Sequence, residues 1–367
     1  MCDKITSKNI KETGIDMTIV LALFMLLMVY DMKIAKRGSF VSDYLSIEKT
    51  KPIKGIFTFL VFLSHAKSYI SMDSIFDKHC HIFLSLLGQM MVAMFLFYSG
   101  YGIMESIKRK GFSYVADLLK KRLPKLLIRF DVAVLLYFIL QHFIFNVRFD
   151  SFVFWTSWIA YSSLGNSNWY IFIMLSFYVL VFISFYNLKR KENNKYYTSA
   201  TIFTLLTIIL VFSLKYAGKQ YWWYDTAILF PLGVWYSLLK NKIAAFVMKN
   251  DRRYFIIFVI IIFICLVSAK FKGILGLISY TVWGIAFTLF IVVSTMKITF
   301  GNKILNFFGD HVFSIYILQR LPMITLNNLG LAKSNKYLFF VLSLFITILL
   351  AIGFDKFFEL FEKKKQD

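Results

Sequence analysis

The chain has 367 residues, of which 59% are hydrophobic, and its mean hydropathy of +0.66 excludes an ordinary soluble globular protein. Its 42 Lys and Arg residues against 20 Asp and Glu residues give a net charge of +22, an excess that in a membrane protein belongs to cytosolic loops and does not indicate nucleic-acid binding. Cys2, Cys80 and Cys265 show no CxxC or metal-ligand spacing, so we predict neither a disulfide framework nor a metal site.

Apolar stretches spread from end to end predict an all-α, polytopic membrane protein of about eleven transmembrane helices. We expect these helices near 15–34, 53–70, 81–104, 126–147, 168–187, 198–214, 224–239, 254–269, 275–296, 308–329 and 337–357. The apolar segment 152–164 is too short to span and is interpreted as an interfacial or re-entrant piece.

The N-terminal region resembles a signal sequence, because Lys4, Lys8 and Lys11 precede the apolar run 17–30. No small-residue cleavage site follows that run, whose next residue is Asp31. We therefore expect an uncleaved first span.

Loops rich in Lys and Arg alternate with loops that are poor in them. This alternation predicts the orientation of the chain in the membrane. The rich loops are 31–54, 105–125, 188–197 and 240–253, together with the tail 361–367. The positive-inside rule places these loops and the C-terminus in the cytosol. The N-terminus then lies outside, although its own lysines favour the cytosol.

Lys54 and His65 lie eleven residues apart within one apolar stretch. At about 100° per residue they are three turns plus roughly 20° apart, so both side chains lie on one helix face, roughly 16 Å apart along the axis. His65 then lies near the middle of the bilayer, where an ionisable group indicates function and an imidazole can transfer protons. The alternatives are a polar helix-packing role for His65 and an interfacial position for Lys54 with its ammonium in the headgroups.

A basic stripe enters the predicted fourth span. Arg122, Lys125 and Arg129 are spaced three and four apart and therefore lie on one face of a helix. With Lys54 at the same expected depth, they form a candidate site for the phosphates of a polyanion. Positive-inside anchoring is the alternative explanation.

Two further pairs are candidates for a site. Arg320 lies inside an apolar run, where insertion of a charge costs about 2.5–3.5 kcal/mol, and Tyr316 is one turn earlier on the same face. Asn168 and Trp169 begin a predicted helix at its outer end. Trp169 can also be explained as an aromatic-belt residue.

Several motifs, in order, resemble those of the acyltransferase family 3 membrane proteins. The motifs are Lys54-Gly-Ile-Phe-Thr-Phe-Leu-Val-Phe-Leu-Ser-His65, Phe95-Leu-Phe-Tyr-Ser-Gly-Tyr101, Lys121-Arg-Leu-Pro-Lys125, Asn168-Trp169-Tyr170, Phe230-Pro-Leu-Gly-Val-Trp-Tyr236 and Ser314-Ile-Tyr-Ile-Leu-Gln-Arg-Leu-Pro322. The chain departs from the family pattern at Lys54, where the family has Arg, and at Gln319, where many members have His. The resemblance covers about residues 50–360, which we expect to form a ten-helix core, after an N-terminal helix and linker in 1–49 and before a basic cytosolic tail in 361–367.

The resemblance implies transfer of an acyl group, most often acetyl, from cytosolic acetyl-CoA or another acyl-CoA to a hydroxyl of an envelope glycan or its lipid-linked precursor. It also implies a location in the bacterial cytoplasmic membrane, with no permanently bound cofactor. His65 is then the general base, with Lys54, Arg320 and Tyr316 as the other catalytic candidates. Lys54 and the basic stripe are then expected to bind coenzyme A. Asn168, Trp169 and Gln319 are expected to bind the acceptor.

A transporter or flippase for a lipid-linked saccharide or small metabolite is the alternative function. Such proteins often contain internal repeats and helices broken by Gly or Pro near the bilayer centre. This chain has four prolines and no evident repeat, which favours the enzyme.

Overall fold

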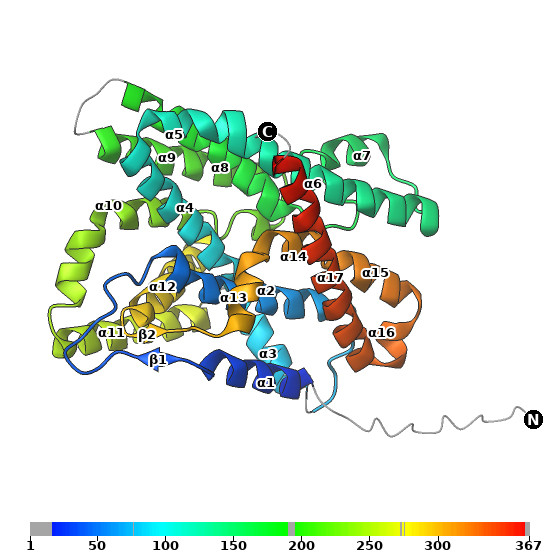
Figure 1. Cartoon of the computed structure of the whole chain (residues 1–367), viewed down its shortest axis with the longest axis horizontal. Coiled ribbons are helices and arrows are strands. Elements are labelled where there is room, and N and C mark those ends of the chain that lie inside the picture. The colour runs from blue at the N-terminus through cyan, green and yellow to red at the C-terminus, as the bar shows by residue number, and fades with distance from the viewer. Residues whose placement is uncertain (1–16, 76, 190–194, 272–273, 275, 364–367) are drawn as a thin grey trace, which may run out of the picture.

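The computed structural model describes residues 17–75, 77–189, 195–271, 274 and 276–363, which fold almost entirely into helices (Figure 1). The α-helices are α1 (Met17–Val29), α2 (Ile47–Ala66), α3 (Lys78–Leu87), α4 (Met90–Lys110), α5 (Phe112–Asp117), α6 (Leu123–Phe138), α7 (Ser151–Ser157), α8 (Trp169–Phe185), α9 (Lys195–Tyr216), α10 (Leu229–Val247), α11 (Asp251–Phe271), α12 (Leu277–Thr295), α13 (Lys303–Asp310), α14 (Val312–Leu318), α15 (Arg320–Asn328), α16 (Leu331–Ser334) and α17 (Lys336–Lys363). Strands β1 (Lys33–Ile34) and β2 (Ile298–Thr299) pair antiparallel. The expected all-α class is confirmed.

Long apolar helices make the chain a multi-pass membrane protein. Among the described residues, six segments are long and apolar enough to span a bilayer: Lys78–Lys110, Trp169–Leu188, Lys195–Tyr216, Asp251–Phe271, Leu277–Thr295 and Lys336–Glu362. Helix α11 is an example of such a segment. Its side chains Phe255, Val259 and Phe263 are exposed on the surface of the protein. Apolar side chains exposed in this way are suited to contact with lipid.

Several predicted spans differ from the helices in the structure. The predicted helix 81–104 is two helices, α3 and α4, which are separated at Gly88, whose φ of +47° is a backbone conformation that favours glycine. The predicted helix 308–329 is divided among α13, α14 and α15. The helix predicted from residue 53 already begins at Ile47, because the Ser46 side chain accepts a hydrogen bond from the Lys49 amide and caps it.

The two ends of the chain were expected to carry a first span and a basic tail. Helix α1 covers Met17–Val29 of the expected span 15–34, whose residues 15 and 16 lie outside the described residues, and the short helix α7 (Ser151–Ser157) overlaps the segment 152–164. The N-terminal lysines within 1–16 and the tail residues 364–367 lie outside the described residues.

Helix α2 lies at the centre of the molecule, in contact with α4, α13 and α14 (Figure 1). Glycine allows the closest of these contacts. A Cβ atom added at Gly55 of α2 would collide with the Leu305 carbonyl of α13, and one at Gly309 would collide with the Lys51 carbonyl of α2. The two backbones therefore touch where small residues face each other, which is how membrane helices pack without a hydrophobic driving force.

A second glycine contact joins α4 to α10. A Cβ atom at Gly100 would collide with the Phe230 carbonyl, and one at Gly233 would collide with the Phe97 carbonyl. Both glycines belong to the motifs that carry the family resemblance. Their role in helix packing follows from this geometry.

We expect Gly100→Ala and Gly233→Ala each to destabilise the protein by about 1–3 kcal/mol, because the added methyl group forces the α4 and α10 backbones apart. Thermal unfolding of the detergent-purified protein measures the effect. Gly102→Ala on the same helix is the matched control, since its Cβ would meet nothing within 4 Å. Equal melting temperatures for Gly100→Ala and Gly102→Ala would contradict the packing role.

Candidate active site

A cavity of about 1050 Å³ opens between α2, α3, α4, α12, α14, α15 and the segments 153–169 and 219–223. It brings together five of the predicted site residues, which are His65, Asn168, Trp169, Tyr316 and Arg320. These residues come from parts of the chain more than 100 positions apart. Their convergence on one cavity wall is a product of the fold.

His65 is half-buried on α2 and faces Tyr316, with 6.4 Å between the two ring centroids. Tyr170 packs edge-to-face against Tyr316, with 5.6 Å between the two ring centroids. Gln319 is fully buried next to His65 and donates its amide hydrogen to the Tyr316 carbonyl over 3.1 Å. The His65 imidazole therefore lies next to the Tyr316 ring and the Gln319 amide, in the wall of the large cavity.

Three buried polar atoms around this histidine have no hydrogen-bond partner among the described residues. They are His65 Nδ1, the Tyr316 hydroxyl oxygen and Gln319 Oε1. Buried polar groups in native proteins are almost always paired, since an unpaired one costs about 1–3 kcal/mol. His65 and Tyr316 line the large cavity, and their unpaired atoms indicate a site for a polar ligand there.

Arg320 begins α15 and also faces the large cavity. Its Nε donates a hydrogen bond to the Tyr69 hydroxyl over 3.2 Å, and its guanidinium lies 5.9 Å from the centre of that ring. Within the described residues no carboxylate pairs with it. A guanidinium held by a tyrosine and open to a cavity can bind an anion or stabilise developing negative charge.

Asn168 and Trp169 lie where the segment before α8 meets the cavity. The Asn168 side-chain amide donates hydrogen bonds to the carbonyl oxygens of Ala160 and Ser162, each over 2.9 Å. Ala160 has a φ of +60°, a conformation that needs such support in a residue with a side chain. Asn168 therefore holds the loop in shape, while Trp169 lines the cavity beside it.

A second, smaller cavity of about 200 Å³ continues from the first. Its lining is almost wholly apolar, and it shares Val61, Val92 and Tyr316 with the large cavity. Thr58 on α2 and Leu126 on α6 lie on its wall. The two cavities meet next to His65.

One face of α2 follows both cavities. Lys54, Thr58, Val61 and His65 are spaced four, three and four apart, and the last three line the cavities. Lys54 itself does not line either cavity but lies one turn beyond Thr58, half-buried. The predicted common face of Lys54 and His65 agrees with this arrangement, with the lysine beyond the small cavity and the histidine at the large one.

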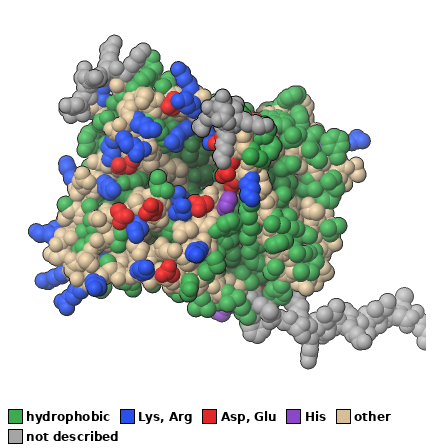
Figure 2. All heavy atoms as spheres, in the orientation of Figure 1, with side chains coloured by type: hydrophobic (Ala, Val, Ile, Leu, Met, Phe, Trp, Pro, Cys, Tyr) green, Lys and Arg blue, Asp and Glu red, His purple; other side chains and the backbone are tan. Residues whose placement is uncertain are grey.

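Basic loops gather at one end of the helix bundle, which we call the basic end. The loop before α2 contacts the start of α11 through the Gly38 amide and Asp251, over 2.6 Å, and Lys297 pairs with the same carboxylate. The end of α4 contacts α10 through Lys108 and the Ser237 carbonyl, over 3.0 Å. Figure 2 shows Lys and Arg side chains over much of this face, around a hollow.

The basic stripe lies at this end, beside the small cavity. Arg122, Leu126 and Arg129 share a helix face, and Leu126 lines that cavity. Arg122 stacks over the Tyr114 ring at 4.7 Å. Within the described residues it has no carboxylate partner.

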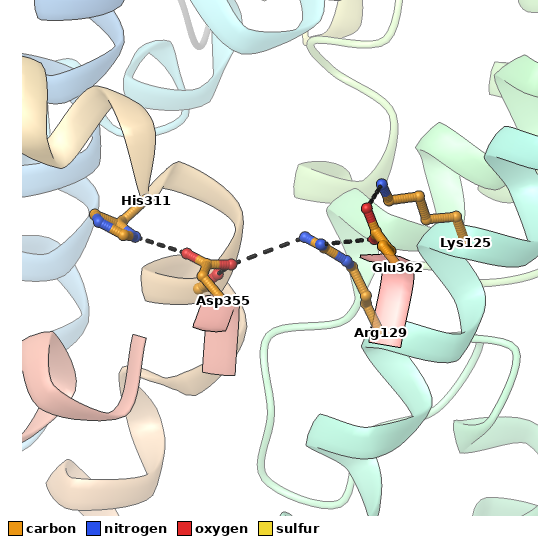
Figure 3. A network of polar contacts seen from close by, with 6 residues as sticks. Lys125, Arg129, His311, Asp355 and Glu362 are labelled. Carbon is orange, nitrogen blue, oxygen red and sulfur yellow. Dashed lines mark hydrogen bonds and ion pairs between the residues drawn. The ribbon is translucent and has the colours of Figure 1, made fainter. Parts of the chain in front are cut away.

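The other two cations of the stripe pair with carboxylates of α17 (Figure 3). Lys125 lies 2.7 Å and Arg129 3.0 Å from Glu362, and Arg129 lies 3.8 Å from Asp355. Asp355 also pairs with His311 over 2.6 Å. Part of the predicted phosphate site is therefore occupied by acidic side chains that join α6 to α17.

The sequence analysis did not select Asp355 or Glu362. They lie seven residues apart, which is about two helical turns, and so share one face of the last helix. The first and last residues of the basic stripe, Arg122 and Arg129, have the same separation. Which acidic face meets which basic face depends on the order of helices in the bundle, and no single-helix pattern contains that information.

We expect Asn168→Ala to lower the stability of the folded protein by about 1–3 kcal/mol, because two backbone carbonyls lose their donor. Asn168→Asp should cost as much, since an ionised carboxylate cannot donate. Thermal unfolding and limited proteolysis between α7 and α8 measure both. Gln220→Ala is the control, because Gln220 also lines the cavity. Unchanged stability in both Asn168 variants would contradict the anchoring role.

A family model described as an acyltransferase domain, Acyl_transf_3, matches residues 53–356, which is more than half of the chain. No curated protein and no solved structure matches the chain.

Proposed function

This chain belongs to acyltransferase family 3, and from that premise we propose that it transfers an acyl group, most often acetyl, from an acyl-CoA to a hydroxyl of an envelope glycan or its lipid-linked precursor. One observation carries the proposal. The large cavity, which His65 lines, and the small cavity share Val61, Val92 and Tyr316, so a hydroxyl in the one and a thioester in the other can both lie near the His65 imidazole.

The small cavity is the proposed donor side. The positive-inside rule assigns the basic end to the cytosol, where coenzyme A is available. Arg122 and Lys54 lie at that end without carboxylate partners among the described residues and are suited to bind its phosphates. The apolar wall of the small cavity suits the uncharged arm that ends in the thioester.

The large cavity is the proposed acceptor side. Its wall carries serine, asparagine and tryptophan side chains, which suit the hydroxyls and the apolar faces of a sugar. On this assignment the protein acts at the bacterial cytoplasmic membrane, with its C-terminus in the cytosol.

His65 acts as the general base in the proposed reaction. It takes the proton of the acceptor hydroxyl as the oxygen attacks the thioester carbonyl. Tyr316 and Arg320 donate hydrogen bonds to the oxyanion of the tetrahedral intermediate. The new carbon–oxygen bond remains, the carbon–sulfur bond breaks, and the proton passes from His65 to the departing thiolate.

We expect His65→Ala to reduce acyl transfer by about 10²–10⁴-fold, because the hydroxyl then lacks its base. Release of free coenzyme A from acetyl-CoA, together with acetylation of cell-surface polysaccharide followed by NMR, measures transfer. His81→Ala removes an exposed histidine and is the control. A His65→Ala protein that folds normally and retains full activity would remove His65 as the base.

Coenzyme A should stabilise the purified protein against unfolding, by about 2.7 kcal/mol at a concentration 100 times its dissociation constant. Arg122→Gln should weaken that binding by about tenfold, because one charge-assisted hydrogen bond to phosphate is lost. Arg109→Gln, an exposed arginine at the same end, is the control. A transporter of the alternative class predicts no stabilisation by coenzyme A, and that result would reject the enzyme.

A further inference from the structure

The charged side chains on the wall of the large cavity are all basic. Lys219 and Arg320 lie there with His65, and no Asp or Glu is among the described residues that line it. A cavity that concentrates positive charge without an internal counter-ion attracts an anion and repels a cation.

Lys219 is held in the cavity wall by aromatic rings. Its ammonium nitrogen lies 3.3 Å from the centre of the Tyr161 ring and 4.3 Å from that of Trp223, and it donates a hydrogen bond to the Tyr161 carbonyl over 2.9 Å. Burial lowers the pKa of this lysine. These contacts fix the position of the Lys219 ammonium between two loops. Among the described residues, no carboxylate lies within ion-pair distance of it.

Lys67 adds a third cation next to the cavity. Its ammonium donates a hydrogen bond over 2.7 Å to the hydroxyl of Ser85, which lines the cavity. Like Arg320 and Lys219, it has no carboxylate partner in the described part of the chain.

Three aspartates in the loops at the same end of the bundle as the large cavity, Asp77, Asp150 and Asp225, do not pair with its cations. Asp77 pairs with Lys336 over 2.7 Å, and Asp150 caps α7 by accepting from the Phe152 amide. Asp225 is buried, lies outside the cavity lining, and has its pKa raised to about 6 by that burial. The positive charge on the cavity wall is therefore not balanced by these groups.

The rest of the wall is suited to a sugar. Ser68, Ser162, Asn166 and Gln220 offer neutral hydrogen-bonding groups, and Trp169 offers an aromatic face. The volume of about 1050 Å³ lies just above the range of roughly 300–1,000 Å³ that is usual for small-ligand sites. The cavity is large enough for a saccharide of more than one ring.

We infer that the acceptor is an acidic saccharide, whose carboxylate or phosphate binds against Lys219 while a neighbouring hydroxyl faces His65. This inference rests on the proposed acyltransferase function, and it names the class of acceptor. Lys219 is a specificity residue here, because it binds a group that does not react.

The test compares three acceptor probes with the purified full chain in lipid nanodiscs: trigalacturonate, its neutral methyl ester, and a glycerol phosphate oligomer of similar length. Binding is followed by thermal stabilisation at low and high salt, and transfer by acetyl incorporation from acetyl-CoA. We expect at least one acidic probe to bind and accept acetyl, its affinity to fall as salt increases, and the methyl ester to bind about tenfold more weakly, the size of one lost interaction with a charged group. The better acidic probe identifies the source of the charge as a carboxylate or a phosphate.

Lys219→Gln should lower the affinity for the acidic probe about tenfold and leave the affinity for the methyl ester unchanged. Lys219→Arg should restore the preference, which a purely structural role for the lysine does not predict. Lys215→Gln removes an exposed lysine outside the cavity and is the control.

Equal binding of the methyl ester, binding of no acidic probe, or an unchanged preference in Lys219→Gln would overturn the inference. Stabilisation by coenzyme A is measured on the same samples. If it persists, the acyltransferase proposal stands and only the acceptor class is wrong. If coenzyme A has no effect, the failure belongs to the proposed function.

Discussion

The backbone contact between α2 and α13 at Gly55 and Gly309 is the constraint on which the site depends. Carbonyl oxygens of each helix lie where the other has no side chain, so the two helices cannot slide past each other without a collision. His65 lies ten residues along α2 from Gly55 and is therefore carried to a fixed depth in the bundle. Helix α14, which follows α13 at once, then presents Tyr316 to the imidazole.

The second glycine contact, between α4 and α10, has a related consequence. Gly100 and Gly233 hold α4 close to α10, and α4 contributes Val92 to both cavities. Packing through small residues lets helix backbones approach closely. In this chain the contact holds α4, and with it Val92, beside both cavities.

Charge is distributed unequally between the two ends of the site. At the basic end, carboxylates of α17 balance Lys125 and Arg129, while Arg122 stacks on a tyrosine. In the large cavity, Arg320 and Lys219 are held by tyrosine and tryptophan rings, and neither pairs with a carboxylate in the described part of the chain. Aromatic rings orient a cation without cancelling its charge, so these groups remain available to an anionic ligand.

Hydropathy and loop charge were enough to predict the membrane class, and the ordered motifs were enough to predict the family, which the match over residues 53–356 confirms. Helix breaks were harder to predict. Gly88 interrupts an apolar run whose hydropathy is continuous. The predicted helix 308–329 is divided among α13, α14 and α15, of which α13 and α14 contact α2. Asn168 was predicted to bind substrate, but the bonds that it makes to Ala160 and Ser162 depend on a loop conformation that its own sequence does not reveal.

The sequence by itself determined that the chain is helical, crosses a membrane and places Lys54 and His65 on one helix face, because hydropathy and helical periodicity are local properties. Only the tertiary structure decided that Arg320, Trp169 and Lys219 share a cavity with His65, and that α17 neutralises part of the basic stripe. Those relations join residues far apart in the chain, and they follow from which helices pack together.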